Sequence, residues 1–286
     1  MDWRKAARQV RDVHARSDAV PLSGGRPVTD PPQAPTRGRS RAWPGRLARC
    51  IGLAAWLLAL VPAAGAAPFE DSMAQRMLAC TGCHGKDGRA EGNVYFPRIA
   101  GKPAGYLFNQ LRNFRDGRRS YSLMTGMVAV LDDDYLREIA QYFAALALPY
   151  PPPAPSNLSA QSAAMAQALI EQGDPQRQLA ACTTCHGAAL TGVLPHVPGL
   201  LGLPRDYINA QLGAWKTGQR HAGAPDCMAQ VARSLTVDEV AAISSWLAAQ
   251  ALPADTRAVA ASALAAQGDR ARPVCGSAPE LAGPSR

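Results

Sequence analysis

The sequence lacks any convincing segment in which apolar and polar residues alternate, as they do in a half-buried β-strand. It also lacks an apolar run that would cross a bilayer comfortably, since Ile51–Val61 is shorter than the about 20 residues that a spanning helix needs. These absences argue against a β-sheet protein. They also make an uncleaved membrane anchor the weaker interpretation of the apolar run.

A strong charge of one sign is missing as well, once the N-terminal region is set aside. The whole chain has 30 basic and 22 acidic residues, a formal charge of +8. Residues 67–286 hold 19 of these basic residues and 18 of the acidic ones. Such a nearly neutral chain gives no indication of a nucleic-acid partner.

The N-terminal region predicts export. Arginines precede the apolar run Ile51–Val61, and Ala64-Gly65-Ala66 offers the small residues that a signal peptidase reads. We therefore expect a signal peptide at 41–66 and a periplasmic protein, with peripheral membrane association left open. Residues 1–40 are rich in Arg, Pro, Gly and Ser and have no apolar period, so they predict an unstructured leader. One hypothesis is that translation starts later, for example at Val28, and that this leader is never made.

Two short motifs carry the chemistry. Cys-x-x-Cys-His occurs twice, ending at His84 and at His186. This pattern is the attachment signature of c-type haem, in which two thiols bind the porphyrin and the adjacent histidine ligates the iron. A zinc site would need two more Cys or His ligands at short spacing, and a thioredoxin-like pair would need a βαβ context. We therefore predict two covalently attached haem c groups, bound through the thiols of Cys80, Cys83, Cys182 and Cys185.

The motifs belong to a longer internal repeat. Tyr106-Leu107-Phe108-Asn109-Gln110-Leu111 corresponds to Tyr207-Ile208-Asn209-Ala210-Gln211-Leu212, and further pairs follow up to Leu131 and Leu235. The proline-rich stretch 149–157 predicts an extended linker. We therefore expect one domain at 67–148, a second at 158–253, and an Ala/Pro-rich tail at 254–286.

Each repeat predicts helices alone. The first helix is expected near 70–80 and again near 160–181. The second is expected to begin at Lys102-Pro103 and Leu203-Pro204 and to end before Gly117 and Gly218. The last is expected to follow the N-cap residues Asp132 and Thr236, with apolar residues at the spacing of one buried face.

The repeat also selects the second iron ligands. Aligning Leu131 with Leu235 places Met124 opposite Met228, whereas Met127 faces Val231. We therefore predict His84 and Met124 as the iron ligands of the first site, and His186 and Met228 as those of the second. Met127 is interpreted as a core residue.

Other residues are expected to support the two sites. A ligating histidine usually donates its second N–H to a carbonyl, and Pro97 and Pro198 follow the histidines at suitable spacing. The duplicated pairs Tyr106/Tyr207 and Arg119/Arg220 would either reach haem propionates or lie on helix surfaces. Of the remaining cysteines, Cys50 lies within the signal, and Cys227 and Cys275 are a plausible disulfide.

The order of these motifs resembles the periplasmic di-haem cytochrome c4 family over nearly all of residues 70–250. Met124-Thr125-Gly126-Met127 and the following Ala140-Gln141-Tyr142-Phe143 are its most specific stretches. The resemblance implies an all-α fold of two tandem class I cytochrome c domains, related by a pseudo-twofold with facing haem edges. It also implies electron transfer to a terminal oxidase or another redox partner. The departures are the long leader, the tail and Cys227.

Three functions follow from these observations. The first is an electron carrier or relay that has no small-molecule substrate and is not an enzyme. The second is a dedicated cytochrome subunit of a dehydrogenase that oxidises, for example, sulfide or an alcohol. The third is a haem enzyme of sulfur metabolism, in which Cys227 or His221 would replace Met228 at the iron.

Overall fold

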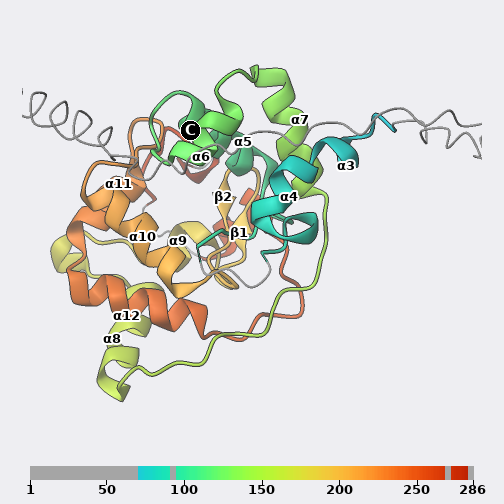
Figure 1. Ribbon diagram of the computed structural model, residues 1–286. Coiled ribbons are helices and arrows are strands. Elements are labelled where there is room, and N and C mark those ends of the chain that lie inside the picture. Colours follow the sequence, from blue (N-terminus) through green and yellow to red (C-terminus); the bar gives the residue numbers. More distant parts are fainter. Residues whose placement is uncertain (1–69, 91–94, 268–271, 283–286) are drawn as a thin grey trace, which may run out of the picture. The chain divides into compact units, whose positions relative to one another are not determined.

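The computed structural model describes residues 70–90, 95–267 and 272–282, all within one compact unit, Pro68–Arg286. The predicted signal, leader and Cys50 lie outside these ranges. The first repeat contains α3 (Met73–Arg76), α4 (Leu78–His84), α5 (Ala104–Arg115), α6 (Ser122–Val128) and α7 (Asp133–Ala144) (Figure 1). The second contains α8 (Ala160–Glu171), α9 (Cys182–His186), α10 (Arg205–Lys216), α11 (Cys227–Ser234) and α12 (Val237–Ala248). This is the predicted all-α class.

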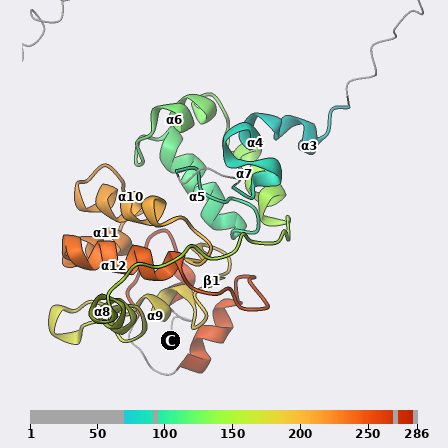
Figure 2. The same ribbon diagram turned by 60° about the horizontal axis from the view of Figure 1, so that its bottom comes forward.

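Each repeat has its own hydrophobic core. In the first, α5 packs along α7, and Leu107, Phe114 and Phe143 are buried between them. In the second, α12 packs against α8 and α10 (Figure 2), and Ile208, Ile243 and similar residues fill the interior. Whether 67–148 and 158–253 are separate domains stays a prediction.

The predicted boundaries of the two middle helices are confirmed. Both α5 and α10 are preceded by a proline at the N-cap and end before a glycine. Gly117 and Gly218 adopt φ of 75° and 73°, a left-handed conformation that residues with a Cβ rarely adopt. Asp132 and Thr236 cap α7 and α12 as expected, and Thr236 forms a reciprocal capping box with Glu239.

Two structural expectations were wrong. The helix expected over 160–181 stops at Glu171, because Gly173 takes φ of 73° and Asp174 caps a separate 3₁₀ turn at Pro175–Arg177. The expectation of helices alone missed a small antiparallel pair, β1 (Gly192–Val193) and β2 (Val197–Pro198). Two-residue strands are too short to show an alternating pattern in the sequence.

The tail is built onto the second repeat. Val259 of the tail forms a bridge with Val193 of β1, and η3 (Ala261–Gln267) contacts α9. Beyond it lies a second short 3₁₀ helix, η4 (Pro279–Ala282). Val193, Val197, Leu264, Ala278 and Leu281 share a third buried cluster. Among the described residues, no helix is long and apolar enough to cross a membrane.

Candidate haem sites

The two motif histidines have the same local geometry. His84 ends α4 and His186 ends α9, and both side chains are buried. The His84 Nδ1 atom lies 2.8 Å from the Pro97 carbonyl oxygen, and the His186 Nδ1 atom lies 2.7 Å from that of Pro198. Both predicted carbonyl contacts are therefore confirmed. A carbonyl accepts a hydrogen bond, so Nδ1 carries the proton and Nε2 is left as an iron donor.

Burial favours the neutral form of both imidazoles. It lowers the pKa of His84 and of His186, although the hydrogen bond to the proline carbonyl opposes this shift in each case. Neutral imidazole is the form that ligates a metal. The local environment therefore suits both histidines to iron ligation.

None of the four motif cysteines belongs to a disulfide. Burial raises the pKa of the Cys182 thiol to about 12, and it also raises that of Cys80 and Cys185. Within the described ranges, no group of three or more His, Cys, Asp or Glu side chains could hold a metal ion. The residues present therefore do not suit the zinc alternative, whereas a thiol pair followed by a histidine with a free Nε2 suits haem c.

The predicted methionine ligands lie on equivalent helices. Met124 is on α6 and packs against the first core, and Met228 is the second residue of α11 and packs against the second core. Both helices follow directly on the middle helix of their repeat. The interpretation of Met127 as a core residue was wrong, because its side chain is 48% exposed. It lies one helical turn beyond Leu123, which is also exposed.

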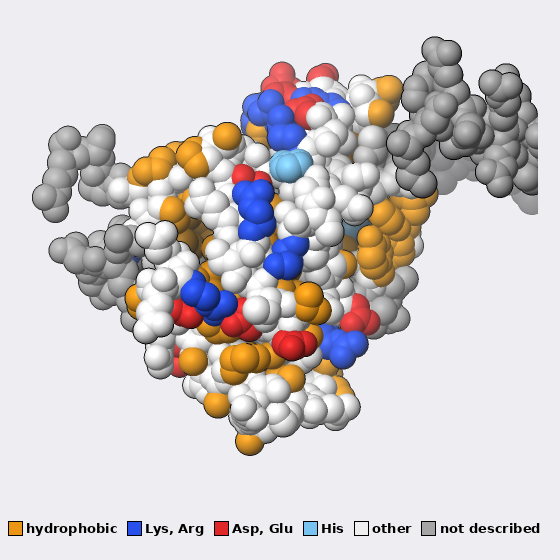
Figure 3. Space-filling model, turned by 90° about the vertical axis from the view of Figure 1, so that its left-hand side faces the viewer, with side chains coloured by type: hydrophobic (Ala, Val, Ile, Leu, Met, Phe, Trp, Pro, Cys, Tyr) orange, Lys and Arg blue, Asp and Glu red, His pale blue; other side chains and the backbone are white. Residues whose placement is uncertain are grey.

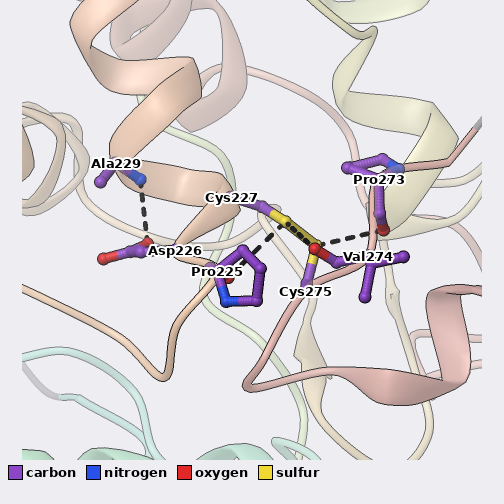
Figure 4. The surroundings of a disulfide bond; sticks show 7 residues. All are labelled: Pro225, Asp226, Cys227, Ala229, Pro273, Val274 and Cys275. Carbon is purple, nitrogen blue, oxygen red and sulfur yellow. Dashed lines mark hydrogen bonds between the residues drawn. A yellow bond between two sulfur atoms is a disulfide. The ribbon is translucent and has the colours of Figure 1, made fainter.

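The helix that carries Met228 is fixed at its start. The Asp226 side chain accepts hydrogen bonds from the backbone N–H of Ala229 at 3.0 Å and of Ala222 at 2.7 Å. This cap satisfies a donor of the first helical turn. Cys227 follows, and its predicted disulfide with Cys275 is confirmed at an S–S distance of 2.03 Å (Figure 4).

The duplicated tyrosines and arginines meet in one buried network between the repeats. Arg119 donates to the Tyr207 hydroxyl at 3.1 Å and to Gln211 Oε1 at 2.6 Å. Arg220 donates to the same Gln211 oxygen at 2.8 Å and to Gln110 Oε1 at 2.8 Å. The two arginines also pair their backbones as an isolated antiparallel bridge. The alternative of helix-surface residues was therefore wrong.

The network concentrates positive charge. Burial, together with nearby Arg119, lowers the pKa of Arg220 to about 10. Burial also opposes ionisation of Tyr207, but the two guanidiniums more than offset it and lower its pKa. Across the described residues, neither arginine forms an ion pair with a carboxylate. Two buried cations without an anion fit the carboxylates of haem propionates.

A further buried donor is unpartnered near this network. Trp215 Nε1 has no hydrogen-bond partner among the described residues, and its ring lies 3.7 Å from the Arg220 guanidinium carbon. A buried indole N–H normally finds an acceptor. The free donor and the uncompensated cations together show that the residues present fit a bound group with acidic oxygens.

Three residues of the site were not predicted from the sequence. Gln110 and Gln211 join the two arginines, and their recurrence within the repeat was the available signal. Lys102 is 4% exposed and donates to the Gly199 carbonyl of the other repeat at 3.1 Å. No signal marked Lys102, because a lysine in a helix-leading turn is usually a surface residue.

Comparison with known proteins places these features in a family. No family model matches the chain. A thiosulfate dehydrogenase electron acceptor of Thiomonas intermedia is 38% identical over 173 residues, which cover 60% of this chain and 79% of that protein. A cytochrome c4 of Pseudomonas aeruginosa is 34% identical over 193 residues, which cover 67% of this chain and 92% of that one.

Solved structures agree with these relatives. Reduced cytochrome c4 from Pseudomonas stutzeri has a TM-score of 0.54 and 29% identity, covering 62% of this chain and 95% of that chain. The thiosulfate dehydrogenase TsdBA from Marichromatium purpuratum has a TM-score of 0.55 and 37% identity over 60% of this chain, but this covers only 36% of that chain. The chain thus belongs to the cytochrome c4 family, and it is an electron-transfer cytochrome with two covalently attached haem c groups.

Proposed function

We propose that this protein accepts electrons from a thiosulfate-oxidising dehydrogenase in the periplasm and passes them to a further redox protein. The observation that carries this proposal is the 38% identity to a thiosulfate dehydrogenase electron acceptor, over 79% of the length of that protein. A second such acceptor, from Stutzerimonas stutzeri, is 36% identical over 171 residues. Sulfide or alcohol dehydrogenases are less favoured as donors, because none of the relatives named above is described as a partner of one.

In this proposal each repeat binds one haem. Cys80 and Cys83 bind the first, with His84 and Met124 as iron ligands, and Cys182, Cys185, His186 and Met228 do the same for the second. Each haem supplies one iron that is reduced and reoxidised by one electron. The protein residues fix the imidazole tautomers, exclude water and hold the propionates with Arg119 and Arg220.

The proposal treats the protein as a carrier without an active site of its own. Two protein ligands at each iron leave no position for a substrate. Cys227 is bonded to Cys275 in the structure, so it is not a free thiolate that would replace Met228. This observation argues against the haem-enzyme alternative. The likeness to TsdBA covers 36% of that chain, which is too small a part to imply its dehydrogenase activity here.

The proposal is tested by mixing the oxidised protein with a purified thiosulfate dehydrogenase and thiosulfate, and by following haem absorbance. We expect reduction of both haems only when enzyme and thiosulfate are both present. A protein that stays oxidised under these conditions, but is reduced fully by dithionite, would show that thiosulfate dehydrogenase is not its donor. A carrier that serves a terminal oxidase alone would behave in that way.

The membership of the cytochrome c4 family suggests a candidate for the redox protein that accepts electrons from this one. A terminal oxidase, or a carrier that leads to it, would then receive the electrons. Reoxidation of the reduced protein by membranes that contain such an oxidase, blocked by cyanide, would support it. Reoxidation that is insensitive to cyanide would assign another acceptor.

A further inference from the structure

The two repeats differ at four equivalent positions that border the haem sites. In the first repeat these are Gly82, Cys83, Leu123 and Met127, which we call the first rim. All four are exposed, Leu123 by 59% and Met127 by 48%. Gly82 and Cys83 lie within the haem-attachment motif, and Leu123 directly precedes the proposed ligand Met124. Leu123 and Met127 are four residues apart on α6 and therefore share one face.

The corresponding positions of the second repeat are covered. They are Thr184, Cys185, Cys227 and Val231, which we call the second rim, and each is buried or partly buried. Cys227 stands where the first repeat exposes Leu123, and it is bonded to Cys275 of the tail. Cys185 and Cys227 both pack against the cluster that Leu264, Ala278 and Leu281 of the tail help to form.

Several independent contacts hold the tail in this place. Gly276 donates its N–H to the Pro225 carbonyl at 3.0 Å, and a Cβ at Gly276 would lie 2.0 Å from the Ala224 oxygen. Val259 exchanges backbone hydrogen bonds with the β1 region, 3.0 Å to Gly192 and 2.8 Å from Leu194. Glu280 accepts hydrogen bonds from both the backbone and the ring of His196. The tail is therefore a fixed cover over Cys185 and Cys227 of the second rim.

Electron transfer between proteins requires that a partner approach a haem closely, and of the two rims only the first is exposed among the described residues. We infer that redox partners dock on the first rim and that the second haem exchanges electrons through the first. The inference rests on the proposed function as an electron relay. It follows from the position of the tail and from the bond between Cys227 and Cys275.

The surface chemistry indicates the kind of partner. The rim itself is apolar and uncharged, and ion pairs elsewhere in the first repeat join Arg76 to Asp71 and Arg137 to Asp134. Figure 3 shows a different side of the molecule, the one where α10, α11 and α12 lie in Figure 1, and there Lys and Arg side chains are interspersed with Asp and Glu. A surface without net charge gives little electrostatic steering. The occupant is therefore a redox protein with an apolar surface around its own cofactor.

The test uses the full-length protein with both haems and a bulky hydrophobic oxidant, tris(phenanthroline)cobalt(III). Each reduced haem iron gives one electron to one cobalt(III), which becomes cobalt(II). Leu123→Lys places a repelling charge on the first rim, and Val274→Lys is the matched control. Val274 is 65% exposed and adjoins Cys275 on the tail. At an ionic strength of about 0.15 M, salt screens the electrostatic effect of the added charge beyond about 8 Å.

We expect Leu123→Lys to slow oxidation of both haems by about tenfold, because the second haem empties through the first. Val274→Lys should stay within about twofold of the natural protein. An unchanged rate in Leu123→Lys, slowing of only half the absorbance change, or slowing by Val274→Lys would each overturn the inference. Adding Cys227→Ser and Cys275→Ser to Leu123→Lys removes the disulfide and should restore fast oxidation of the second haem, seen as half of the absorbance change.

Hydrogen exchange gives a readout that does not depend on electron transfer. Removing the disulfide should increase amide exchange at Ala181–His186 and leave exchange at Cys80–His84 unchanged. Equal exchange at 181–186 with and without the disulfide would overturn the claim that this bond holds the cover in place. If thiosulfate dehydrogenase fails to reduce the natural protein, the proposed donor is wrong. The cobalt oxidation and hydrogen-exchange experiments do not depend on that donor, so they test the docking surface separately.

Discussion

Arg119 donates a hydrogen bond to the hydroxyl of Tyr207 at 3.1 Å, although 88 residues separate the two in the chain. The arginine comes from the turn after α5 of the first repeat, and the tyrosine from α10 of the second. Both are buried. The contact shows that the duplicated residues do not serve each repeat alone, because each repeat supplies groups that the other uses.

Replacing Arg119 should therefore weaken the contact between the repeats. Arg119→Ala removes one hydrogen-bond donor from each of Gln110, Gln211 and Tyr207, and leaves the two glutamine oxygens with Arg220 as their donor. We expect this loss to lower the free energy of unfolding by about 1–3 kcal/mol. It should also raise the pKa of Tyr207, which the guanidinium now lowers. Urea unfolding and ultraviolet titration of tyrosine measure the two effects. Arg137→Ala, at an exposed pair with Asp134, should change neither. Equal behaviour of the two variants would contradict the role of the network.

The cap on α11 should hold Met228 in position. Asp226→Ala leaves the backbone donor of Ala229 without its acceptor and should lower the free energy of unfolding by about 1 kcal/mol. It should also make the Met228 methyl signal in the reduced protein broaden or disappear at lower temperature than in the natural protein. Ser159→Ala removes a similar cap from α8, which carries no proposed ligand, and should cost stability alone. A loss of the Met228 signal in both variants would contradict this local role.

Because Met124 and Met228 are assigned to different irons, replacing either one should change the reduction potential of one haem alone. Met124→Ala should lower the reduction potential of one haem, and Met228→Ala that of the other, because a thioether ligand raises the potential. Covalent haem content should stay the same, since the thiols and histidines are intact. Redox titration followed by haem absorbance measures both. Met127→Ala is the control, because Met127 is exposed and lies opposite Val231 in the repeat. Unchanged potentials in the first two variants would rule out this ligand set.

The buried Lys102 should make stability depend on pH. Burial, reinforced by nearby Arg98, lowers the pKa of its amine to about 7. Lysine in an unfolded chain titrates at about 10.4. Between these values the unfolded chain binds more protons, so the free energy of unfolding should rise with pH, and below about 7 this contribution should be constant.

Urea unfolding at several pH values from 7 to 10 tests this expectation. Lys102→Met should show a smaller rise in stability over this range than the natural protein. Lys86→Met, at an exposed lysine, should show the same rise as the natural protein. A natural protein and a Lys102→Met variant with identical slopes would contradict the lowered pKa.

The parts of the fold and site that repeat were predictable from the sequence. The two Cys-x-x-Cys-His motifs fixed the positions of His84 and His186, and the recurring Pro97 and Pro198 predicted the carbonyls that orient them. Proline before and glycine after the middle helices marked α5 and α10 correctly. In each case a local physical rule acts within a few residues, so the sequence is sufficient.

The remaining features depend on contacts between distant segments. Whether Arg119 and Arg220 lie on the surface or in the interior is decided by packing between the repeats, and no local pattern encodes it. Methionine is usually a core residue, yet the side chain of Met127 lies on an exposed face of α6. The tail over the second rim was likewise unpredictable, although the pairing of Cys227 with Cys275 was anticipated from the compartment and the count of cysteines.

We propose that both irons have histidine and methionine ligands and that the protein carries electrons without binding a substrate. Proton NMR of the fully reduced protein tests it most directly, by counting methionine methyl signals shifted far upfield by a haem ring current. We expect two such signals, one lost in Met124→Ala and the other in Met228→Ala. One signal or none would contradict it and would place another ligand, or an open position, at an iron.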